Sequence, residues 1–323
     1  MPLVADIGLL AAGGLLLYLG AEWLVKGAAG LARKFGVSPL VVGMTVVAYA
    51  TSAPELAVTI RAALGGKSAI ALGNAVGSNI ANLGLILGVT ALIAPPRVAG
   101  TLIRREVPML VLSTLLVPLV LLDGQISRIE GFALAAGSVA FTAVLLRSRK
   151  GTDVVEEAEQ SAEEAGAPPG DSKLRLVIIG LVGLAALVLG GDVFVRGAVG
   201  LAAAVGMSER VVGLTIVAVG TSLPELAASL VAAFRGHSDM AVGNIVGSNV
   251  FNVLLILGAA AILNPVEAPL ASIVVDVGAL GVLTLIAAVS LRTARKLSRL
   301  EGALLLLSYA VFLGLLVFGV GAG

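Results

Sequence analysis

The chain has no cysteine and a single histidine in 323 residues, and charged residues make up only 13% of it. Without cysteine there can be no disulfide, thiolate nucleophile or thiolate-ligated metal. One histidine cannot form a histidine-rich metal site, and we expect His237 to be a solvated loop residue near Asp239. The formal charge of +1, with no basic cluster carrying interleaved aromatics, does not indicate nucleic-acid binding.

Most of the chain is apolar. Hydrophobic residues make up 58% of it, and its mean hydropathy is +1.07. So few charges could not cover the surface of a soluble domain, and the apolar residues fall in blocks of roughly 20, the span of a bilayer core. The first block follows MPLVADIG, without a basic segment or a cleavage site, and predicts a retained helix. The sequence therefore predicts an all-α polytopic membrane protein.

The apolar blocks predict about ten transmembrane helices in two sets of five. The predicted spans lie near 3–24, 38–63, 69–94, 107–123, 128–147, 174–194, 209–233, 240–264, 268–290 and 300–320. Between the sets, VVEEAEQSAEEAGAPPGDS is acidic and then rich in Ala, Pro and Gly, as is typical of a solvated tether. We therefore expect a first transmembrane repeat at 1–147, an acidic linker at 148–173 and a second repeat at 174–323.

The distribution of basic residues predicts the orientation. Lysine and arginine favour one side of the predicted spans by about three to one, and this excess marks the cytoplasmic side. Both termini are then outside, and the linker is cytoplasmic. Because each repeat has an odd number of helices, the second must enter the membrane from the opposite side, so the repeats are inverted.

One pattern occurs twice, at an offset of 170 residues (225 − 55). GMTVVAYATSAPELA and ALGNAVGSNIANLGLILG in the first half match GLTIVAVGTSLPELA and AVGNIVGSNVFNVLLILG in the second. Each copy places a carboxylate, hydroxyls, amides, glycine and proline in apolar surroundings. Polar groups are costly inside a membrane, so a duplicated set indicates a function.

The first part of each copy predicts a broken helix. Pro54 and Pro224 lack an N–H and clash with the carbonyl four residues earlier, which leaves nearby backbone oxygens free. Unpaired backbone at membrane depth is tolerated where it lines a cavity or binds a ligand. The candidate ligands are the carboxylates of Glu55 and Glu225, the hydroxyls of Thr51, Ser52, Thr221 and Ser222, and the carbonyls of Ala48, Thr51, Ala218 and Thr221.

The second part of each copy predicts a polar helix face. Ser78 and Asn82 are four residues apart, as are Ser248 and Asn252, with Asn74 and Asn244 one turn earlier. Four glycines at small-xxx-small spacing, Gly73, Gly77, Gly243 and Gly247, predict close helix packing. Taken singly, the serines and asparagines are also explained by helix packing. That explanation does not suit two glutamates in matching proline-broken contexts.

The candidate ligands are all hard oxygens. Ca²⁺ takes about 6–8 such ligands, and two carboxylates balance one Ca²⁺ or two Na⁺. No soft ligand is present for Zn²⁺ or Cu⁺. The sequence therefore predicts a cation site, in which hydroxyls favour Na⁺ as a second ion.

The paired motifs, xTSxPEL followed by GNxxGSNxxNxxLILG, resemble the two α-repeats of the cation/Ca²⁺ exchanger superfamily, which includes the sodium/calcium exchangers. The resemblance covers essentially the whole chain. It implies an inverted five-plus-five helix transporter in which long helices 1 and 6 slide against a bundle that holds the site. Some relatives carry Asp at the position of Asn252, so a middle cation or proton site and the stoichiometry stay open.

The same resemblance implies a role for each matching residue. Glu55 and Glu225 would be the central Ca²⁺ and Na⁺ carboxylates, and the carbonyls of Thr51 and Thr221 would complete the Ca²⁺ site. Na⁺ sites would lie on either side of the centre, which Asn82 and Asn252 would flank. The residues of the Na⁺ sites would be Ala48, Ser52, Ser78, Ala218, Ser222 and Ser248.

Together with these residues, the resemblance implies a monomeric antiporter of the inner membrane that exchanges Na⁺ for Ca²⁺, with no cofactor and no enzymatic activity. One alternative is a Ca²⁺/H⁺ antiporter, because a buried glutamate can take a proton in place of a metal. Another is a K⁺-dependent antiporter of the same superfamily. A cation channel and an intramembrane enzyme with an acidic dyad are further alternatives.

Other charged residues have simpler expected roles. Glu22 with Lys26, and Asp192 with Arg196, are expected to form ion pairs within their own helices, at the same offset of 170 (192 − 22). Glu106 and its equivalent Asp276 are expected to be interfacial charges near helix ends.

Overall fold

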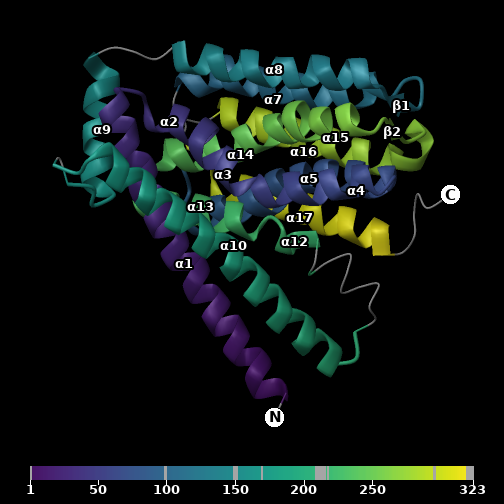
Figure 1. Cartoon of the computed structure of the whole chain (residues 1–323), viewed down its shortest axis with the longest axis horizontal. Helices are drawn as coiled ribbons and strands as arrows, with labels where there is room; N and C mark the ends of the chain where they lie inside the picture. The colour runs from purple at the N-terminus through teal and green to yellow at the C-terminus, as the bar shows by residue number, and fades with distance from the viewer. Residues whose placement is uncertain are drawn as a thin grey trace. The chain divides into compact units, whose positions relative to one another are not determined.

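The computed structural model describes residues 2–97, 100–147, 152–168, 170–207, 216, 218–293 and 296–317, and these are almost entirely helical (Figure 1). The chain divides into two compact units. Unit 1 comprises Met1–Thr51 and Arg149–Asn244, and unit 2 comprises Ser52–Ser148 and Ile245–Gly323. Each unit takes segments from both halves of the sequence, so the units cut across the predicted repeats at 1–147 and 174–323.

Unit 1 is built on two long helices, α1 (Pro2–Phe35) and α10 (Lys173–Ala204). Its shorter elements include residues 43–51 of the first motif copy and the break at Ser222 with Glu225 of the second. They are α2 (Pro39–Val42), the π-helix η1 (Gly43–Val47), α3 (Ala48–Thr51), α9 (Thr152–Glu164), α12 (Ala218–Gly220), α13 (Leu223–Phe234) and the first half of α14 (Ser238–Phe251).

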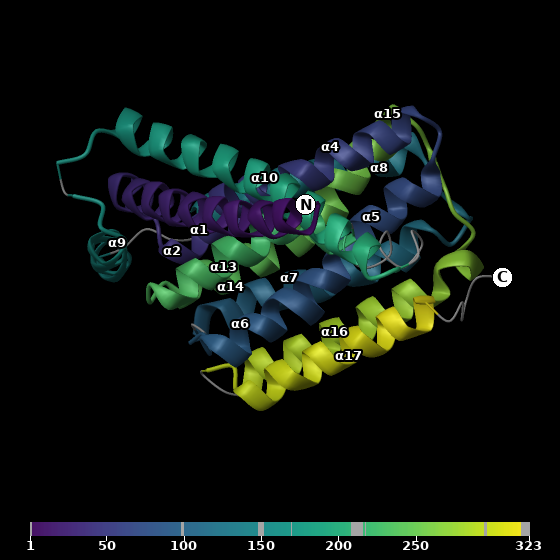
Figure 2. The same cartoon turned by 90° about the horizontal axis from the view of Figure 1, so that it is seen from below.

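Helices α1 and α10 pack together along much of their length (Figures 1 and 2). A Cβ atom at Gly20 would lie 2.7 Å from the amide nitrogen of Leu187, and one at Gly183 would lie 2.5 Å from that of Leu24. Only glycine allows backbones to approach this closely. The contact residues recur every seven positions, at Gly13, Gly20 and Gly27 in α1 and at their equivalents Gly183, Gly190 and Gly197 in α10.

Both motif helices are broken, as predicted, and the break lies two residues before each proline. Ser52 (φ −81°, ψ 6°) and Ser222 (φ −93°, ψ 7°) interrupt the helix, and α4 (Ala53–Leu64) and α13 start directly after them. Each new helix has its proline in the first turn, where a missing N–H costs nothing. Glu55 and Glu225 therefore stand in first turns, where the helix dipole favours negative charge.

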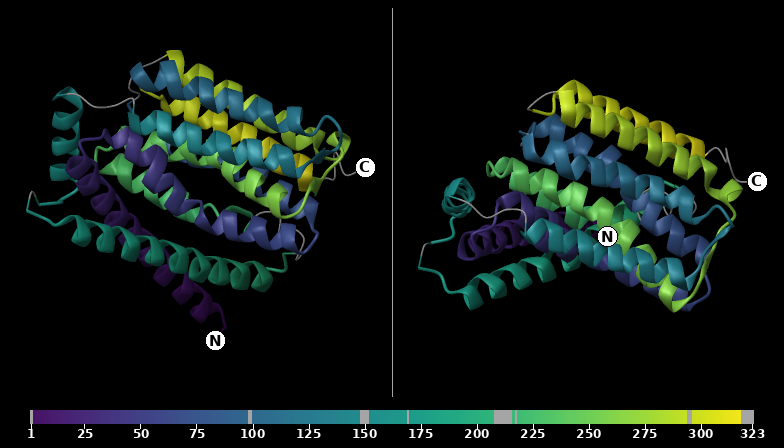
Figure 3. Two further views of the ribbon diagram at one scale, coloured as in Figure 1. Left: turned by 45° about the horizontal axis from the view of Figure 1, so that its top comes forward. Right: turned by 90° about the horizontal axis from the view of Figure 1, so that it is seen from above.

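Unit 2 is a bundle of helix pairs. Helix α6 packs on α17, α8 on α15, and α16 on both α7 and α17 (Figures 2 and 3). A two-stranded antiparallel sheet at one end pairs Gln125 with Glu267. Besides α4, the elements are α5 (Ser68–Ala81), η2 (Asn82–Ile86), α6 (Leu87–Ile93), α7 (Gly100–Val120), β1 (Gln125–Ile126), α8 (Arg128–Arg147), the second half of α14, η4 (Asn252–Leu257), α15 (Gly258–Leu263), β2 (Val266–Glu267), η5 (Leu270–Ile273), α16 (Val274–Thr293) and α17 (Arg299–Val317).

The fold class agrees with the prediction: the protein is a multi-pass helical membrane protein. Within the described residues, 7 helices are long and apolar enough to cross a membrane, or 8 if the broken pair Pro39–Thr51 and Ala53–Leu64 is one span. Helix α7 provides another predicted span. The start of the predicted span 209–233 lies outside the described residues. Helices α1 and α10 extend well beyond the predicted ends at 24 and 194.

The linker differs from the solvated tether that its composition predicts, because it contains helix α9. Ala158 and Ala162 are buried, and α9 contacts α1 and α2 within unit 1. The Arg33 guanidinium holds the segment after α9 by donating to the carbonyls of Ala167 (3.0 Å) and Pro168 (2.6 Å). The linker is therefore a packed part of unit 1. The cluster of alanines on one face of α9 makes that packing possible.

The expectation that His237 is a solvated loop residue is wrong. Its side chain is buried, 3% exposed, and its Nδ1 lies 2.8 Å from the hydroxyl of Ser161 in α9. The sequence placed it correctly in the loop after α13, but the docked linker covers that loop. Burial lowers the pKa of His237, and the nearby Arg235 adds to this, while Glu164, 3.8 Å away, opposes it.

We expect the docking of α9 to weaken in acid. Because the pKa of His237 is lowered in the folded state, the undocked chain binds more protons as the pH falls below the ordinary value of 6.5. The stabilisation is thus complete above that pH and declines below it. Hydrogen-exchange protection factors of α9, corrected for intrinsic rates, should be several-fold lower at pH 5.5 than at pH 7.5.

A His237→Gln variant is the control, because its amide cannot be protonated in this range. Its α9 protection should be the same at both pH values. Equal protection of α9 in the wild type at the two pH values would contradict the prediction.

Candidate functional site

In unit 1, the site is organised around Asn244. Its Nδ2 donates to the Ser229 hydroxyl (3.0 Å) and to the carbonyl of Glu225 (3.5 Å), and its Oδ1 accepts from the Thr51 hydroxyl (3.2 Å). The sequence analysis singled out Asn244, Glu225 and Thr51 but not Ser229. Asn244 therefore ties the first turn of α13, with its buried glutamate, to the end of α3.

In unit 2, Asn74 makes two equivalent contacts through its amide nitrogen. Its Nδ2 donates to the carbonyl of Glu55 (3.1 Å) and to the hydroxyl of Thr59 (2.9 Å). Glu55 is 1% exposed, and so is Glu225 in unit 1. The duplicated motif thus folds in the same local way twice, with an asparagine on the next helix holding the peptide group of each glutamate. This sets the direction of the first helical turn from which the carboxylate projects.

Asn79 and Asn249 form a pair in unit 2 that we did not single out from the sequence. The amide of Asn79 donates to the carbonyl of Asn249 (3.1 Å), and Asn252 donates to the Oδ1 of Asn79 (2.9 Å). The amide of Asn249 donates to the carbonyl of Ile245 (2.7 Å). Their signal was present, because both stand in the repeated GSN triplet at the offset of 170 (249 − 79).

Several buried oxygens of unit 2 are available for a ligand. The Oδ1 atoms of Asn82 and Asn252 and the hydroxyl of Ser248 have no hydrogen-bond partner within the described part of the chain, although each residue is at most 1% exposed. Buried polar atoms are nearly always paired, since desolvation without a partner costs about 1–3 kcal/mol. An oxygen of this kind is satisfied when it coordinates a cation.

A helical irregularity marks the same two positions. The π-helix η2 begins at Asn82, where the N–H of Leu87 bonds the Asn82 carbonyl, and η4 begins at Asn252. A π-turn widens the helix and shifts the backbone carbonyls from their usual directions, and such turns are frequent at functional sites. The hydrophobicity pattern does not reveal them, because the apolar run continues unbroken.

The remaining predicted ligands are also enclosed. Ser52, Ser78, Ser222 and Thr51 are at most 5% exposed, while Thr221 is partly buried. The backbone of Ala218 lies in α12, and its side chain is outside the described residues; Ala48 is buried in α3. Glu55, Ser52, Ser78, Asn82, Ser248 and Asn252 belong to unit 2, and Ala48, Thr51, Ala218, Thr221, Ser222 and Glu225 to unit 1.

One predicted helix-end ion pair is confirmed and the other is wrong. Arg196 pairs with Asp192 at 2.8 Å. Glu22 instead receives two hydrogen bonds from Arg235, with Nε at 2.8 Å from Oε1 and Nη2 at 2.6 Å from Oε2. The end of α13 packs on α1 and brings a planar guanidinium to the carboxylate, which it binds better than the ammonium of Lys26 does.

The expected interfacial position of Glu106 is also wrong. Glu106 is 1% exposed within unit 2, because it lies well inside α7, which packs on α16. Its equivalent Asp276 is partly exposed in the first turn of α16, as expected of an interfacial charge.

Comparison with known proteins identifies the family. The sequence model of the sodium/calcium exchanger protein family matches residues 6–147 and 175–318. The chain belongs to this family. This membership confirms the resemblance seen in the repeated motifs, and it makes the protein a member of the Ca²⁺/cation exchanger superfamily.

Individual relatives agree with the assignment. The putative antiporter CaxA of Alkalimonas amylolytica is 40% identical over 312 residues, covering 95% of this chain and 97% of CaxA. The inner membrane protein YrbG of Escherichia coli (strain K12) is 40% identical over 265 residues, covering 80% of each. Among solved structures, the sodium-calcium exchanger NCX_Mj, soaked with Na⁺ and Ca²⁺, has a TM-score of 0.81 and 30% identity, covering 96% of this chain and 97% of NCX_Mj.

Proposed function

We propose that this exchanger moves Na⁺ against Ca²⁺ by alternating access to one central site, and that Glu55 and Glu225 are its two carboxylates. The observation that supports this most is their equivalence. Each is buried in the first turn of a helix that restarts after the same Ser-x-Pro break, and each has its carbonyl held by an asparagine. Buried carboxylates at membrane depth are expensive unless they are compensated.

Electrostatics then accounts for obligatory exchange. An empty site with two carboxylates carries a charge of −2, and sealing it from water leaves uncompensated charges whose desolvation costs several kcal/mol per ion. One Ca²⁺ or two Na⁺ cancel that charge. Only the occupied site can therefore close and reopen on the other side, so a net downhill flow of one ion drives the other uphill. The protein carries ions and does no covalent chemistry in this proposal.

The neutral oxygens would complete the coordination. The Thr51 and Thr221 carbonyls would join the two carboxylates around Ca²⁺, with about 6–8 oxygens needed in all. Na⁺ would bind on either side through Ala48, Ser52, Ser78, Ala218, Ser222 and Ser248. In unit 2, the oxygens of Asn82, Asn252 and Ser248 support this role, because they are buried and have no hydrogen-bond partner in the described part of the chain.

We also propose an orientation. The basic residues place the linker, with its docked α9, in the cytoplasm and both termini outside. An inner-membrane location follows from YrbG, which is named as an inner membrane protein. We propose that one chain is the functional unit, because both copies of the motif are present in it.

The coupling ion can be tested in proteoliposomes that contain the purified wild-type protein and radioactive calcium outside. An outward Na⁺ gradient alone should drive calcium uptake well above the level of protein-free liposomes. Outward H⁺ or K⁺ gradients of equal size, each with the membrane potential clamped, should not. Uptake driven only by the H⁺ gradient would make the protein a Ca²⁺/H⁺ antiporter, and uptake that needs both Na⁺ and K⁺ would make it K⁺-dependent.

A further inference from the structure

Unit 1 contains an apolar groove that the exchange mechanism does not use. It has a volume of about 680 Å³ and lies among α1, α10 and α13. Leu17 of α1 and Phe194 of α10 form part of its wall, and Leu223, Leu226 and Leu230 line it from one face of α13. These α13 residues are only partly buried by the protein, so in a membrane the groove is open to lipid.

One end of the groove is polar. Tyr18, Glu22 and Arg235 line it there, and the Glu22–Arg235 pair is half accessible, with side-chain exposures of 22% and 48%. Arg235 is the residue at which α13 ends, and it also interacts with Tyr18. The groove is thus amphipathic along its length: leucine-lined toward the middle of the helices and charged at one end.

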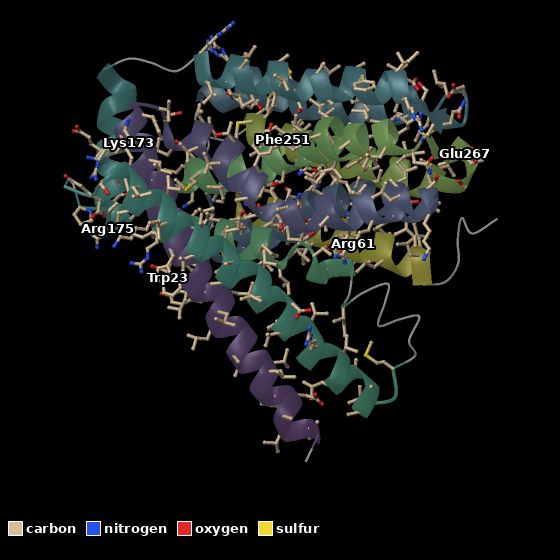
Figure 4. The ribbon with its side chains drawn as sticks, viewed as in Figure 1. Trp23, Arg61, Lys173, Arg175, Phe251 and Glu267 are labelled. Atoms are coloured by element: carbon tan, nitrogen blue, oxygen red, sulfur yellow. The ribbon has the colours of Figure 1, made fainter. Side chains whose placement is uncertain are left out.

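Neighbouring residues place the polar end at the membrane surface. Trp23, the single tryptophan of the chain, follows Glu22 and points away from α1 (Figure 4). Its side chain is 39% exposed, and Tyr18 is 50% exposed. Exposed tryptophan and tyrosine gather where acyl chains meet headgroups. The charged pair therefore stands at headgroup level, and the leucines of α13 stand at acyl-chain level.

We propose that this groove binds a phosphatidylethanolamine molecule, with an acyl chain along α13 and the headgroup on Glu22 and Arg235. The charges are complementary, because a carboxylate beside a guanidinium matches a primary ammonium beside a phosphate. Arginine binds phosphate through two parallel N–H···O bonds, and the carboxylate accepts from an N–H of the ammonium. Phosphatidylcholine has no N–H to donate to Glu22, and phosphatidylglycerol has no positive group for it.

The lipid would lie on the helix that carries Glu225. Leu223 lines the groove and stands between Ser222 and Pro224, so an acyl chain there contacts the first turn of α13 itself. Glu22 also has an informative counterpart, since its repeat equivalent Asp192 pairs with Arg196 inside one helix and is not among the groove residues. Asp192 therefore does not contribute to the proposed lipid site.

The test is lipid retention by the full-length protein in native mass spectrometry, which does not depend on the proposed Na⁺/Ca²⁺ exchange. The protein is incubated in mild detergent with phosphatidylethanolamine, phosphatidylcholine or phosphatidylglycerol of identical acyl chains. The wild type should retain phosphatidylethanolamine roughly tenfold better than either of the others. Glu22→Gln should reduce this preference to near unity, and the matched control Asp192→Asn should keep it.

A Leu230→Trp variant fills the groove without altering the charged pair, and it should lose phosphatidylethanolamine as well. It also tests the proposal if Glu22→Gln fails to fold. Equal retention of the three lipids by the wild type would overturn the proposal, because it would show acyl-chain binding alone. Undiminished preference in both Glu22→Gln and Leu230→Trp would overturn it too.

Discussion

We expect Glu55→Gln and Glu225→Gln each to reduce gradient-driven calcium uptake by at least about 100-fold. Removing one member of a set of buried, mutually compensating charges costs about 3–5 kcal/mol, which corresponds to roughly two to four orders of magnitude in affinity. Glutamine keeps the shape of the side chain, and both glutamates stand in helical first turns whose backbone contacts with Asn74 and Asn244 do not involve the carboxylate. Folding should therefore be preserved while Ca²⁺ binding is lost.

The measurement uses the gradient that drives the wild type, with uptake normalised to the protein reconstituted. Glu267→Gln, in β2 on the exposed surface of unit 2, is the matched control, because within the described residues its backbone pairs with Gln125 and Ser68 while its carboxylate makes no hydrogen bond. Calcium should raise the unfolding temperature of the wild type and of this control but not that of the two site variants. Wild-type uptake by either site variant would remove that glutamate from the site.

Gly183→Ala should markedly destabilise the protein, although alanine is the better helix former. Its Cβ would lie 2.5 Å from the Leu24 amide nitrogen and 2.7 Å from the Gly20 carbonyl oxygen, both backbone atoms that no rotamer change can move away. Helices α1 and α10 would have to separate. Overpacking of this kind costs about 1–3 kcal/mol, which should appear as a lower unfolding temperature and as slower exchange of Na⁺ for Ca²⁺.

Gly180→Ala isolates the cause, because Gly180 stands on the same helix less than one turn earlier. A Cβ atom there meets nothing within 4 Å in the described part of the chain. This variant should be neutral or slightly stabilising, by up to about 1 kcal/mol from helix propensity. The close-contact explanation fails if Gly180→Ala and Gly183→Ala lower the unfolding temperature equally.

Much of the candidate site could be predicted because its signals are local. A proline inside a helix removes a hydrogen bond and clashes with the carbonyl four residues earlier, so Pro54 and Pro224 predicted the interruptions that occur at Ser52 and Ser222. The rule is a tendency, because α7 continues through Pro108 and Pro118. The offset of 170 then paired each residue with its equivalent. The same offset also pointed to Asn79 and Asn249, but the hydrogen bond between them needs two segments of α5 and α14 to meet, and no spacing shows that.

Three expectations about charged or titratable residues were wrong for a common reason. Glu22 was expected to pair with Lys26, His237 to be exposed to solvent, and Glu106 to lie at the membrane interface. In each case the sequence showed the neighbours along the chain, whereas the outcome depended on a helix from elsewhere: α13 for Glu22, α9 for His237 and α16 for Glu106. The partner of a charged group is set by distance in space, because the interaction energy decreases as the separation grows. Nearness along the sequence does not ensure nearness in the folded chain.

The sequence by itself determined the membrane class, the helical spans and the two copies of the polar motif. Hydropathy and proline geometry act over a few residues, and a repeat is read directly by aligning the chain with itself, so none of these signals depends on packing. Only the tertiary structure decided which side chains hold each glutamate in place, that the linker is docked, and that α1, α10 and α13 enclose a groove with a charged end. These features arise from contacts between different helices, 19 residues apart for each glutamate and its asparagine and more than 100 residues apart for the linker and the groove. Burial and pairing depend on such contacts.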